Sequence, residues 1–368
     1  MTHVHPSRIV GVLCVVFLGT IVAASRMNAR GQAVPPAVTW RAALDQAGTW
    51  YGGADAVRIA ANLVLYQRSS GGWPKNIDMA KSLTPTEMAS IADEKDLNDS
   101  TIDNDSTHTQ LRFLASVFNA STRAEFKASF DRGLDYLLRA QYPNGGWPQY
   151  FPLRTNYSRH ITFNDNAMIG VMRVLRDVSV GREPFAFVDA AARAKAGAAV
   201  ARGVSLIVKA QVRVNGKLTV WCAQHDEVTL APAQGRAYEH PSQSGSESVG
   251  IVRFLMDGER PTPEIVAAIE GAVDWFRRSE LRGLKLVDTP IPDPPHGRER
   301  VVVSDASAPP LWARFYEVAT NRPIFSDRDG VIKYSLAEIG IERRTGYSWY
   351  GTWPLELLER DYPRWKKR

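Results

Sequence analysis

The chain has 368 residues, 44% of them hydrophobic, and its 45 Lys and Arg residues outnumber 39 Asp and Glu residues to give a formal net charge of +6. This apolar content is sufficient for a sizeable core. The positive charges are interspersed with acidic residues and form no long Lys/Arg run, so the sequence argues against nucleic acid and favours an acidic polymer or an anionic surface as the partner.

The N-terminus has the pattern of an export signal. A polar start precedes the apolar stretch of residues 9–24, which is typical of a signal peptide. We therefore expect residues 1–25 to be a signal peptide, residues 26–38 to be a linker, and residues 39–368 to form a single catalytic domain that is secreted or periplasmic. An uncleaved anchor is the alternative, whereas cleavage predicts no stable membrane association.

After the linker, apolar residues recur with helical spacing. The segments with this periodicity are residues 55–67, 106–120, 128–141, 164–178, 188–211, 246–257, 262–281, 307–320 and 335–343. Thr84 and Thr262, each followed by Pro and an acidic residue, predict helix starts. Strand signal is sparse, with one hairpin predicted over residues 212–221 around Asn215-Gly216. The pattern predicts an all-α chain of about nine to twelve helices with long loops.

A phrase recurs at three of these helix ends: an apolar run, a Gln and then a turn that contains Trp. Gln67, Gln141 and Gln211 are spaced by 74 and then 70 residues, and the first two copies end in Gly-Gly-Trp-Pro. This spacing suits a unit of two helices and a long loop. Trp147 and its equivalents either form a ring of exposed aromatic faces that stack on sugars or plug the core of each helix pair.

Oxygen-bearing side chains are concentrated where two of the predicted helices begin. Asp103, Asn104 and Asp105 precede the helix predicted at 106–120, and Asp165 lies between two Asn residues at the start of the helix predicted at 164–178. Such oxygens suit Ca²⁺, which takes six to eight oxygen ligands. The same residue types are also preferred as helix N-caps. The two interpretations predict different partners for these side chains.

Residues 221–248 form a long loop that carries candidates for acid–base chemistry. Loops of this length within compact domains are usually functional. His225 and His240 titrate near neutral pH, whereas Arg236 ordinarily stays protonated. On pKa alone a histidine is therefore the easier base. The chain has neither an HExxH pattern nor a G-x-S-x-G elbow, which leaves zinc and serine hydrolase sites without support.

Several phrases together resemble the polysaccharide lyase family 10 pectate lyases. They are TIDN followed by T-x-T-Q, GGWPQYFP, FNDNAM, QHD…P…GR-x-YE-x-PS and NRPIFSDRDG…ERRTGY-x-WYG. The resemblance extends from about Trp50 to Trp353. It implies an (α/α)₃ toroid and calcium-dependent cleavage of polygalacturonate by β-elimination, which leaves unsaturated oligogalacturonates.

The resemblance also implies roles for individual residues. Asp103, Asn104 and Asp165 match the calcium ligands, and Arg236 matches the catalytic base. Arg322 or Arg328 matches an arginine that grips the substrate carboxylate.

Lys75, Trp147 and Tyr238 complete the predicted substrate contacts, and the protein is expected to be a monomer. Two alternatives remain open. One is a non-catalytic toroid that binds acidic polysaccharide, and the other is an inverting glycoside hydrolase that uses a carboxylate pair such as Asp103 and Asp226.

Overall fold

A computed structural model describes residues 38–292 and 296–368. The expected signal peptide, residues 1–25, and the expected linker up to residue 37 lie outside the described residues. Thr39–Arg368 forms one compact unit by its internal contacts. Within the described part of the chain, no helix is both long and apolar enough to cross a lipid bilayer.

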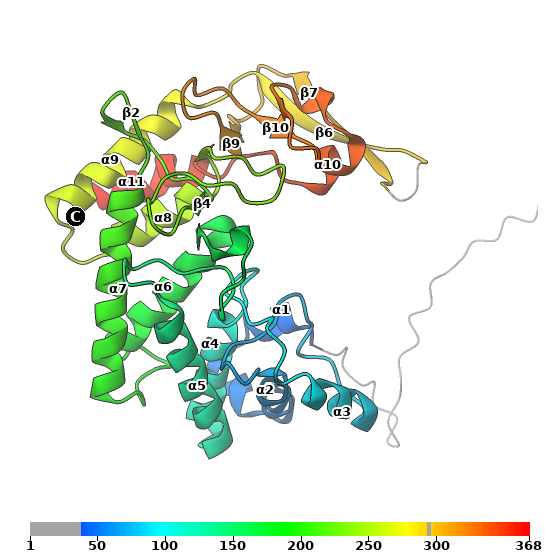
Figure 1. Cartoon of the computed structure of the whole chain (residues 1–368), viewed down its shortest axis with the longest axis vertical. Helices are drawn as coiled ribbons and strands as arrows, with labels where there is room; N and C mark the ends of the chain where they lie inside the picture. The colour runs from blue at the N-terminus through cyan, green and yellow to red at the C-terminus, as the bar shows by residue number, and fades with distance from the viewer. Residues whose placement is uncertain (1–37, 293–295) are drawn as a thin grey trace, which may run out of the picture. The chain divides into compact units, whose positions relative to one another are not determined.

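Helices make up the larger part of the unit that begins at Thr39. They are α1 (Trp40–Ala43), α2 (Ala54–Tyr66), α3 (Pro85–Asp93), α4 (His108–Ser121), α5 (Ala124–Ala140), α6 (Ala167–Ser179), α7 (Ala190–Ala210), α8 (Glu247–Met256), α9 (Pro263–Arg278), α10 (Ile341–Gly346) and α11 (Tyr362–Trp365). Consecutive helices pack as pairs, α4 with α5, α6 with α7 and α8 with α9 (Figure 1). Thr84 begins α3 with a capping box, and Thr262 caps α9, as their Thr-Pro sequences predict.

The prediction of an all-α (α/α)₃ toroid is wrong as a fold class, because the described residues also form six two-stranded antiparallel sheets. The pairs are β1 (Ile161–Thr162) with β4 (Gln224–His225), β2 (Arg213–Val214) with β3 (Lys217–Leu218), β5 (Gln243–Ser244) with β9 (Phe315–Tyr316), β6 (Leu284–Pro290) with β7 (Arg298–Ser304), β8 (Trp312–Ala313) with β12 (Tyr350–Gly351), and β10 (Phe325–Ser326) with β11 (Ile332–Lys333). Only the β2–β3 hairpin was predicted. In Figure 1, β6, β7, β9, β10 and α10 lie together, in yellow to orange.

The helix predicted at residues 307–320 is replaced by strands. Trp312, Phe315 and Tyr316 have helical spacing, but the backbone of this segment pairs with two distant segments instead. The amide of Arg314 donates to the carbonyl of Trp349 at 2.7 Å. Phe315 and Trp349 pack in one buried cluster with Tyr238 and Phe325. Tertiary pairing therefore overrides the local spacing and fixes the position of Arg314.

The repeated Trp turn has a structural role. Trp73, Trp147 and Trp221 are all 0% exposed. Their indole N–H groups donate to the carbonyls of Leu63, Leu137 and Ile207, respectively, at 2.8, 2.8 and 2.7 Å. The exposed ring of aromatic faces is therefore a wrong prediction, and Trp147 is not a substrate contact, because its indole caps and fills the end of the preceding helix.

The glutamine of the phrase joins neighbouring helices. The Gln67 side-chain amide donates to the carbonyls of Gly71 and Ser129, at 2.8 and 2.9 Å. Gln141 and Gln211 make the equivalent pairs of bonds to their own turns and to α7 and α9. The three copies are thus a repeated joint between helix pairs.

Candidate active site

The segments that lead into α4 and α6 have an unusual backbone. Asn104, Asp105 and Thr107 have φ of 49°, 60° and 65°, and Asp165 and Asn166 have φ of 49° and 59°. Non-glycine residues rarely adopt positive φ, and such strained residues tend to cluster at functional sites. The two acidic segments singled out in the sequence are therefore held in conformations that ordinary helix starts do not require.

The side chains in these segments do not cap helices. The N-cap residues are Thr107 for α4 and Asn166 for α6, and neither makes a side-chain capping bond. The carboxylate of Asp165 accepts instead from Arg314 at 2.9 Å and from Asn164 at 2.7 Å. Of the two interpretations that the sequence left open, N-capping is not the one that the hydrogen bonds support.

Asp103 lies in a buried polar cluster. It is 3% exposed, and its Oδ2 accepts from the Lys75 ammonium and from the Gln149 side chain, the latter at 2.6 Å. The other carboxylate oxygen, Oδ1, is buried and has no hydrogen-bond partner in the described residues. The structure therefore pairs two predicted site residues, Lys75 and Asp103, and leaves Oδ1 of Asp103 without a hydrogen-bond donor.

Asp165 is linked to a second buried ion pair. Arg314 is 7% exposed, and its Nη2 donates both to Asp165 and to Glu247, the first residue of α8. Glu247 in turn accepts from the Ser244 hydroxyl. Burial opposes the charge of Arg314, but Glu247, Tyr347 and Asp165 outweigh it and raise the pKa of this guanidinium well above its usual range. Arg314 is therefore a fixed cation.

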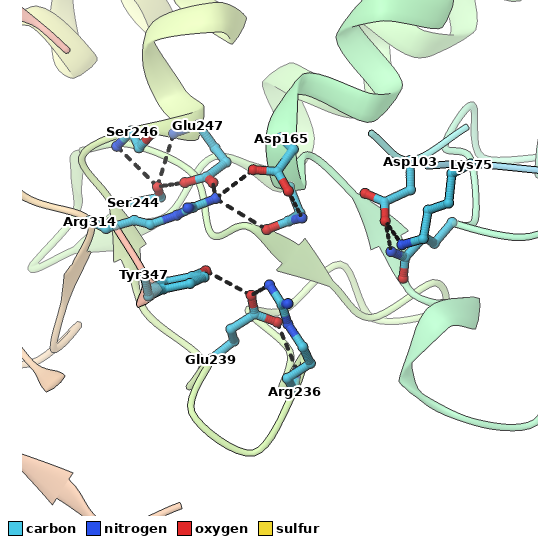
Figure 2. A network of polar contacts seen from close by, with 12 residues as sticks. Lys75, Asp103, Asp165, Arg236, Glu239, Ser244, Ser246, Glu247, Arg314 and Tyr347 are labelled. Atoms are coloured by element: carbon cyan, nitrogen blue, oxygen red, sulfur yellow. Dashed lines mark hydrogen bonds and ion pairs between the residues drawn. The ribbon is translucent and has the colours of Figure 1, made fainter. Parts of the chain in front are cut away.

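Arg236 lies near the Arg314–Asp165 ion pair and is held by the carboxylate of Glu239. Its Nη2 donates to Glu239 at 2.5 Å, and its backbone amide donates to the same carboxylate at 2.9 Å. The Tyr347 hydroxyl also donates to Glu239, at 2.8 Å. Figure 2 shows the Arg236–Glu239–Tyr347 group on one side of Asp165 and the Asp103–Lys75 pair on another.

The protonation of Arg236 follows from these contacts. Burial disfavours the charged form, but the hydrogen bond and the negative charge of Glu239 outweigh burial, and the pKa of Arg236 is raised. The side chain keeps 40% of its exposure. Nε and Nη1 donate no hydrogen bond within the described residues, so the guanidinium presents these nitrogens while Glu239 holds Nη2.

Three other predicted residues lie apart from this network. Asn104 is exposed and donates to Asn76 at 2.8 Å. Arg322 stacks over the Tyr334 ring at 3.7 Å, and Arg328 pairs with Glu342 at 3.1 Å. Neither arginine contacts Asp165 or Arg236, and their roles stay predictions.

Tyr238 is buried beside Arg236. It is 4% exposed and belongs to the buried cluster around Phe315 and Trp349. This ring packs against the guanidinium of Arg236, whose Cζ lies 5.0 Å from the ring centroid, and its role as a substrate contact stays a prediction. Tyr238 therefore supports the guanidinium of Arg236 through a cation–π contact.

The two alternative bases differ in their surroundings. His225 is fully buried; its Nε2 accepts from the Cys222 amide at 3.0 Å, and its Nδ1 faces the Leu230 carbonyl at 2.8 Å. Desolvation lowers the pKa of His225 to about 4. Both ring nitrogens are thus committed to the loop. Desolvation also lowers the pKa of His240.

Sequence analysis missed Arg314, Glu247, Glu239 and Gln149. Arg314 was assigned to a helix, and Glu247 follows a Ser-Gly-Ser segment that suggested only a helix start. Glu239 lies three residues after Arg236, within the phrase that carries the resemblance. A charged residue in the first turn of a predominantly apolar helix, as at Glu247, was the signal that the sequence offered.

The residue types ahead of α4 and α6 suit a calcium ion. Asp103, Asn104 and Asp165 carry carboxylate or amide oxygens of the kind that Ca²⁺ binds, and a cation would satisfy the unpartnered Oδ1 of Asp103. Desolvation, followed by the charges of Asp165 and Asp103, raises the pKa of nearby Asp105. These carboxylates do not converge tightly. Within the described chain, the group of three candidate ligands within 4.8 Å of one another is His160, Asp226 and Glu227.

Comparison with known proteins identifies the family of the chain. The pectic acid lyase family model matches residues 67–358. A mutant of the family 10 polysaccharide lyase from Cellvibrio cellulosa, in complex with trigalacturonic acid, is 35% identical with a TM-score of 0.73, over 87% of this chain and 98% of that chain. A second structure of the family 10 lyase from the same organism is 36% identical with a TM-score of 0.73, over 86% and 94%. No curated protein matches the chain. The chain therefore belongs to the pectic acid lyase family and is a pectate lyase.

Proposed function

We propose that the protein cleaves de-esterified α-1,4-polygalacturonate by calcium-dependent β-elimination. The observation that carries this proposal is the pairing of a buried, fixed cation, Arg314, with Asp165 beside the partly exposed guanidinium of Arg236. Abstraction of the proton at C5 builds negative charge next to a carboxylate. A site for this reaction needs a cation for that charge and a separate group for the proton.

Asp103, Asn104 and Asp165 are the proposed calcium ligands. When bound, Ca²⁺ would neutralise the substrate carboxylate as a Lewis acid. Lys75 already offsets the charge of Asp103, and Arg314 offsets that of Asp165. These two cations position the carboxylates and, at the same time, favour an acidic sugar over a neutral one.

Arg314 is the proposed contact to the substrate carboxylate. Its Nη2 is committed to Asp165 and Glu247, whereas its Nη1 donates to no described residue. A planar guanidinium held in this way binds a carboxylate with defined geometry, which an ammonium group does not. A well-placed donor of this kind contributes about 3–4 kcal/mol to the transition state.

Arg236 is the proposed base. Its Nε or Nη1 takes the C5 proton, the electron pair forms the C4–C5 double bond, and the bond from C4 to O4 breaks as O4 is protonated by water. Glu239 orients the guanidinium but raises its pKa, so the neutral form is scarce at neutral pH. The proposal therefore implies activity that increases with pH.

The direct test is product chemistry. Purified protein is incubated with polygalacturonate, with and without a chelator, and near-ultraviolet absorbance is followed. Unsaturated products that depend on calcium support the proposal. Saturated reducing ends would indicate a hydrolase, and binding without turnover would indicate a non-catalytic module.

We also propose that the protein acts outside the cytoplasm as a monomer. The apolar stretch of residues 9–24 supports export. Sequencing the N-terminus of protein recovered from the periplasm or the medium tests cleavage after residue 25, and sedimentation of the same sample tests the monomer.

A further inference from the structure

A groove rich in arginine lies away from the residues described above. Two cavities, of about 320 and about 400 Å³, share Arg173, Asp257 and Arg368 as lining residues. Together they are lined by eight arginines and three aspartates, with Met256 and Trp365. We call this set the arginine groove: Arg112, Arg173, Arg176, Arg182, Arg253, Arg360, Arg364 and Arg368, with Asp177, Asp257 and Asp361.

The groove lies at the ends of helices opposite the candidate active site. Asp165 precedes α6, whereas Arg173 is the central residue of that helix, about 9 Å beyond its first residue at 1.5 Å per residue, and Arg176 is in its last turn. Glu247 begins α8, whereas Arg253 is in its last turn. The same two helices therefore present acids to the active site and arginines to the groove.

Internal pairing accounts for only part of the positive charge. Arg112 and Arg182 share Asp177, at 2.8 and 2.7 Å. Arg253 and Arg360 are held by Asp361 and by Glu356, which lies beside the groove.

Other arginines of the groove have no acidic partner. Within residues 38–292 and 296–368, the side chains of Arg173, Arg364 and Arg368 make no ion pair and no hydrogen bond, and all three are exposed. Arg176 donates only to the Phe254 carbonyl, at 3.1 Å. Four positive charges thus face one cavity system without a carboxylate of their own.

Helix dipoles do not explain this surplus. Lys and Arg are favourable in the last turn of a helix, which accounts for Arg176 and Arg253. Arg173 is not in the last turn of α6, and Arg364 belongs to a helix of four residues. Desolvation lowers the pKa of Arg173 despite the opposing charge of Asp257, and Arg253 and Arg112 lower it further. An anion bound here would relieve the crowding of like charge.

The lining suits an acidic sugar chain. Arginine binds carboxylates through two parallel hydrogen bonds, and several arginines along a groove match a polymer that bears a carboxylate on each unit. Trp365, half-buried and stacked on Tyr362 at 5.9 Å, adds an aromatic surface to the lining of the first of the two cavities. Aromatic surface beside the cations favours a sugar over a compact inorganic anion.

We propose that the arginine groove is a second binding site for acidic polysaccharide, one that holds the polymer while another part of it is cleaved. The proposal rests on the proposed pectate lyase reaction, because the same polymer serves both sites. It requires no calcium at the groove and no chemistry there. Its effect is to raise the local concentration of long substrate at the catalytic site.

The test compares long and short substrates. The double variant Arg173→Ala/Arg364→Ala removes two unpaired charges, and Lys209→Ala/Lys217→Ala removes two exposed charges that do not line the groove. For the groove variant we expect KM on polygalacturonate to rise by about threefold to tenfold. Its kcat, and its kcat/KM on short oligogalacturonates, should stay within about twofold of the original protein. The control variant should match the original protein on both substrates.

The other possible results of this experiment would overturn the second binding site, its assignment to polysaccharide, or the proposed lyase function. An unchanged KM on the polymer, or an equal loss on long and short substrates, would overturn the second site. Loss of binding to vesicles of phosphatidylglycerol, with an unchanged KM on the polymer, would assign the groove to anionic lipid instead. If the original protein releases no unsaturated product from either substrate, the proposed function fails rather than the groove.

Discussion

Nη2 of Arg314 lies 2.9 Å from Oδ1 of Asp165, although the two residues are 149 positions apart in the chain. The contact depends on two local structures that the sequence does not predict. Asp165 has positive φ just ahead of α6, and Arg314 lies between two short strands rather than in a helix. Glu247 completes the arrangement by holding the same nitrogen.

Arg314→Lys should reduce kcat/KM on polygalacturonate by about 100-fold, because an ammonium group cannot keep both acids and a substrate carboxylate in place. Arg322→Lys and Arg328→Lys are the matched comparisons, since both arginines are exposed and lie apart from Asp165. Steady-state kinetics on the three variants checks the assignment. A larger loss for Arg322→Lys or Arg328→Lys would return the carboxylate contact to the residue that the resemblance suggested.

Glu239→Gln should shift the pH–rate profile toward lower pH. The carboxylate raises the pKa of Arg236, and the base acts in its neutral form, so removing the negative charge makes that form more abundant at a given pH. Activity should therefore begin to rise at lower pH than in the original protein, even if the maximum falls because Arg236 is less well oriented. A profile that stays in place, or moves to higher pH, would argue against Arg236 as the base.

The stability of the fold should decline on acidification because of His225. Burial lowers its pKa to about 4, below its ordinary value of about 6.5, so the neutral form is favoured in the folded state. This contribution is present above pH 6.5 and is lost as the pH falls toward 4, amounting to about 2 kcal/mol by pH 5. Denaturant unfolding at pH 7 and pH 5 measures it. His225→Gln should show a correspondingly smaller difference, and an undiminished one would exclude this residue as the cause.

Trp147→Phe should lower stability without changing substrate affinity. The substitution leaves the Leu137 carbonyl without its indole donor and creates a cavity, which together cost about 2–4 kcal/mol. Thermal unfolding and KM are measured on the same variant. A raised KM with an unchanged melting temperature would restore the sugar-stacking role.

The sequence predicted the helices well where apolar spacing and packing agree, as in α2 and α4 to α9. It failed at residues 307–320, because the spacing of Trp312, Phe315 and Tyr316 fits a helix while strand partners come from residues 243–244 and 350–351. Pairing between distant segments of two residues leaves no local signal. The β6–β7 hairpin was also missed, although residues 301–303 are a run of β-branched valines.

The site residues divide in the same way, into those marked by local sequence and those placed by tertiary contacts. Asp103, Asp165 and Arg236 stand in phrases that mark them, and the structure buries Asp103, gives Asp165 a positive φ and leaves Arg236 partly exposed. Arg314 and Glu247 acquire their roles only through tertiary contacts. Trp147 was misjudged because an aromatic turn can face the core or the solvent, and its sequence is the same in both cases.

Asp165→Ala tests the central claim, that the segment leading into α6 binds calcium for the elimination reaction. Lyase activity and melting temperature are measured across a calcium titration for the variant and the original protein. We expect the original protein to gain thermal stability with calcium, because a ligand stabilises the state that binds it. The variant should lose this gain together with most activity, and high calcium should restore the activity in part. A variant that retains normal activity and the full calcium-dependent rise in melting temperature would contradict the account.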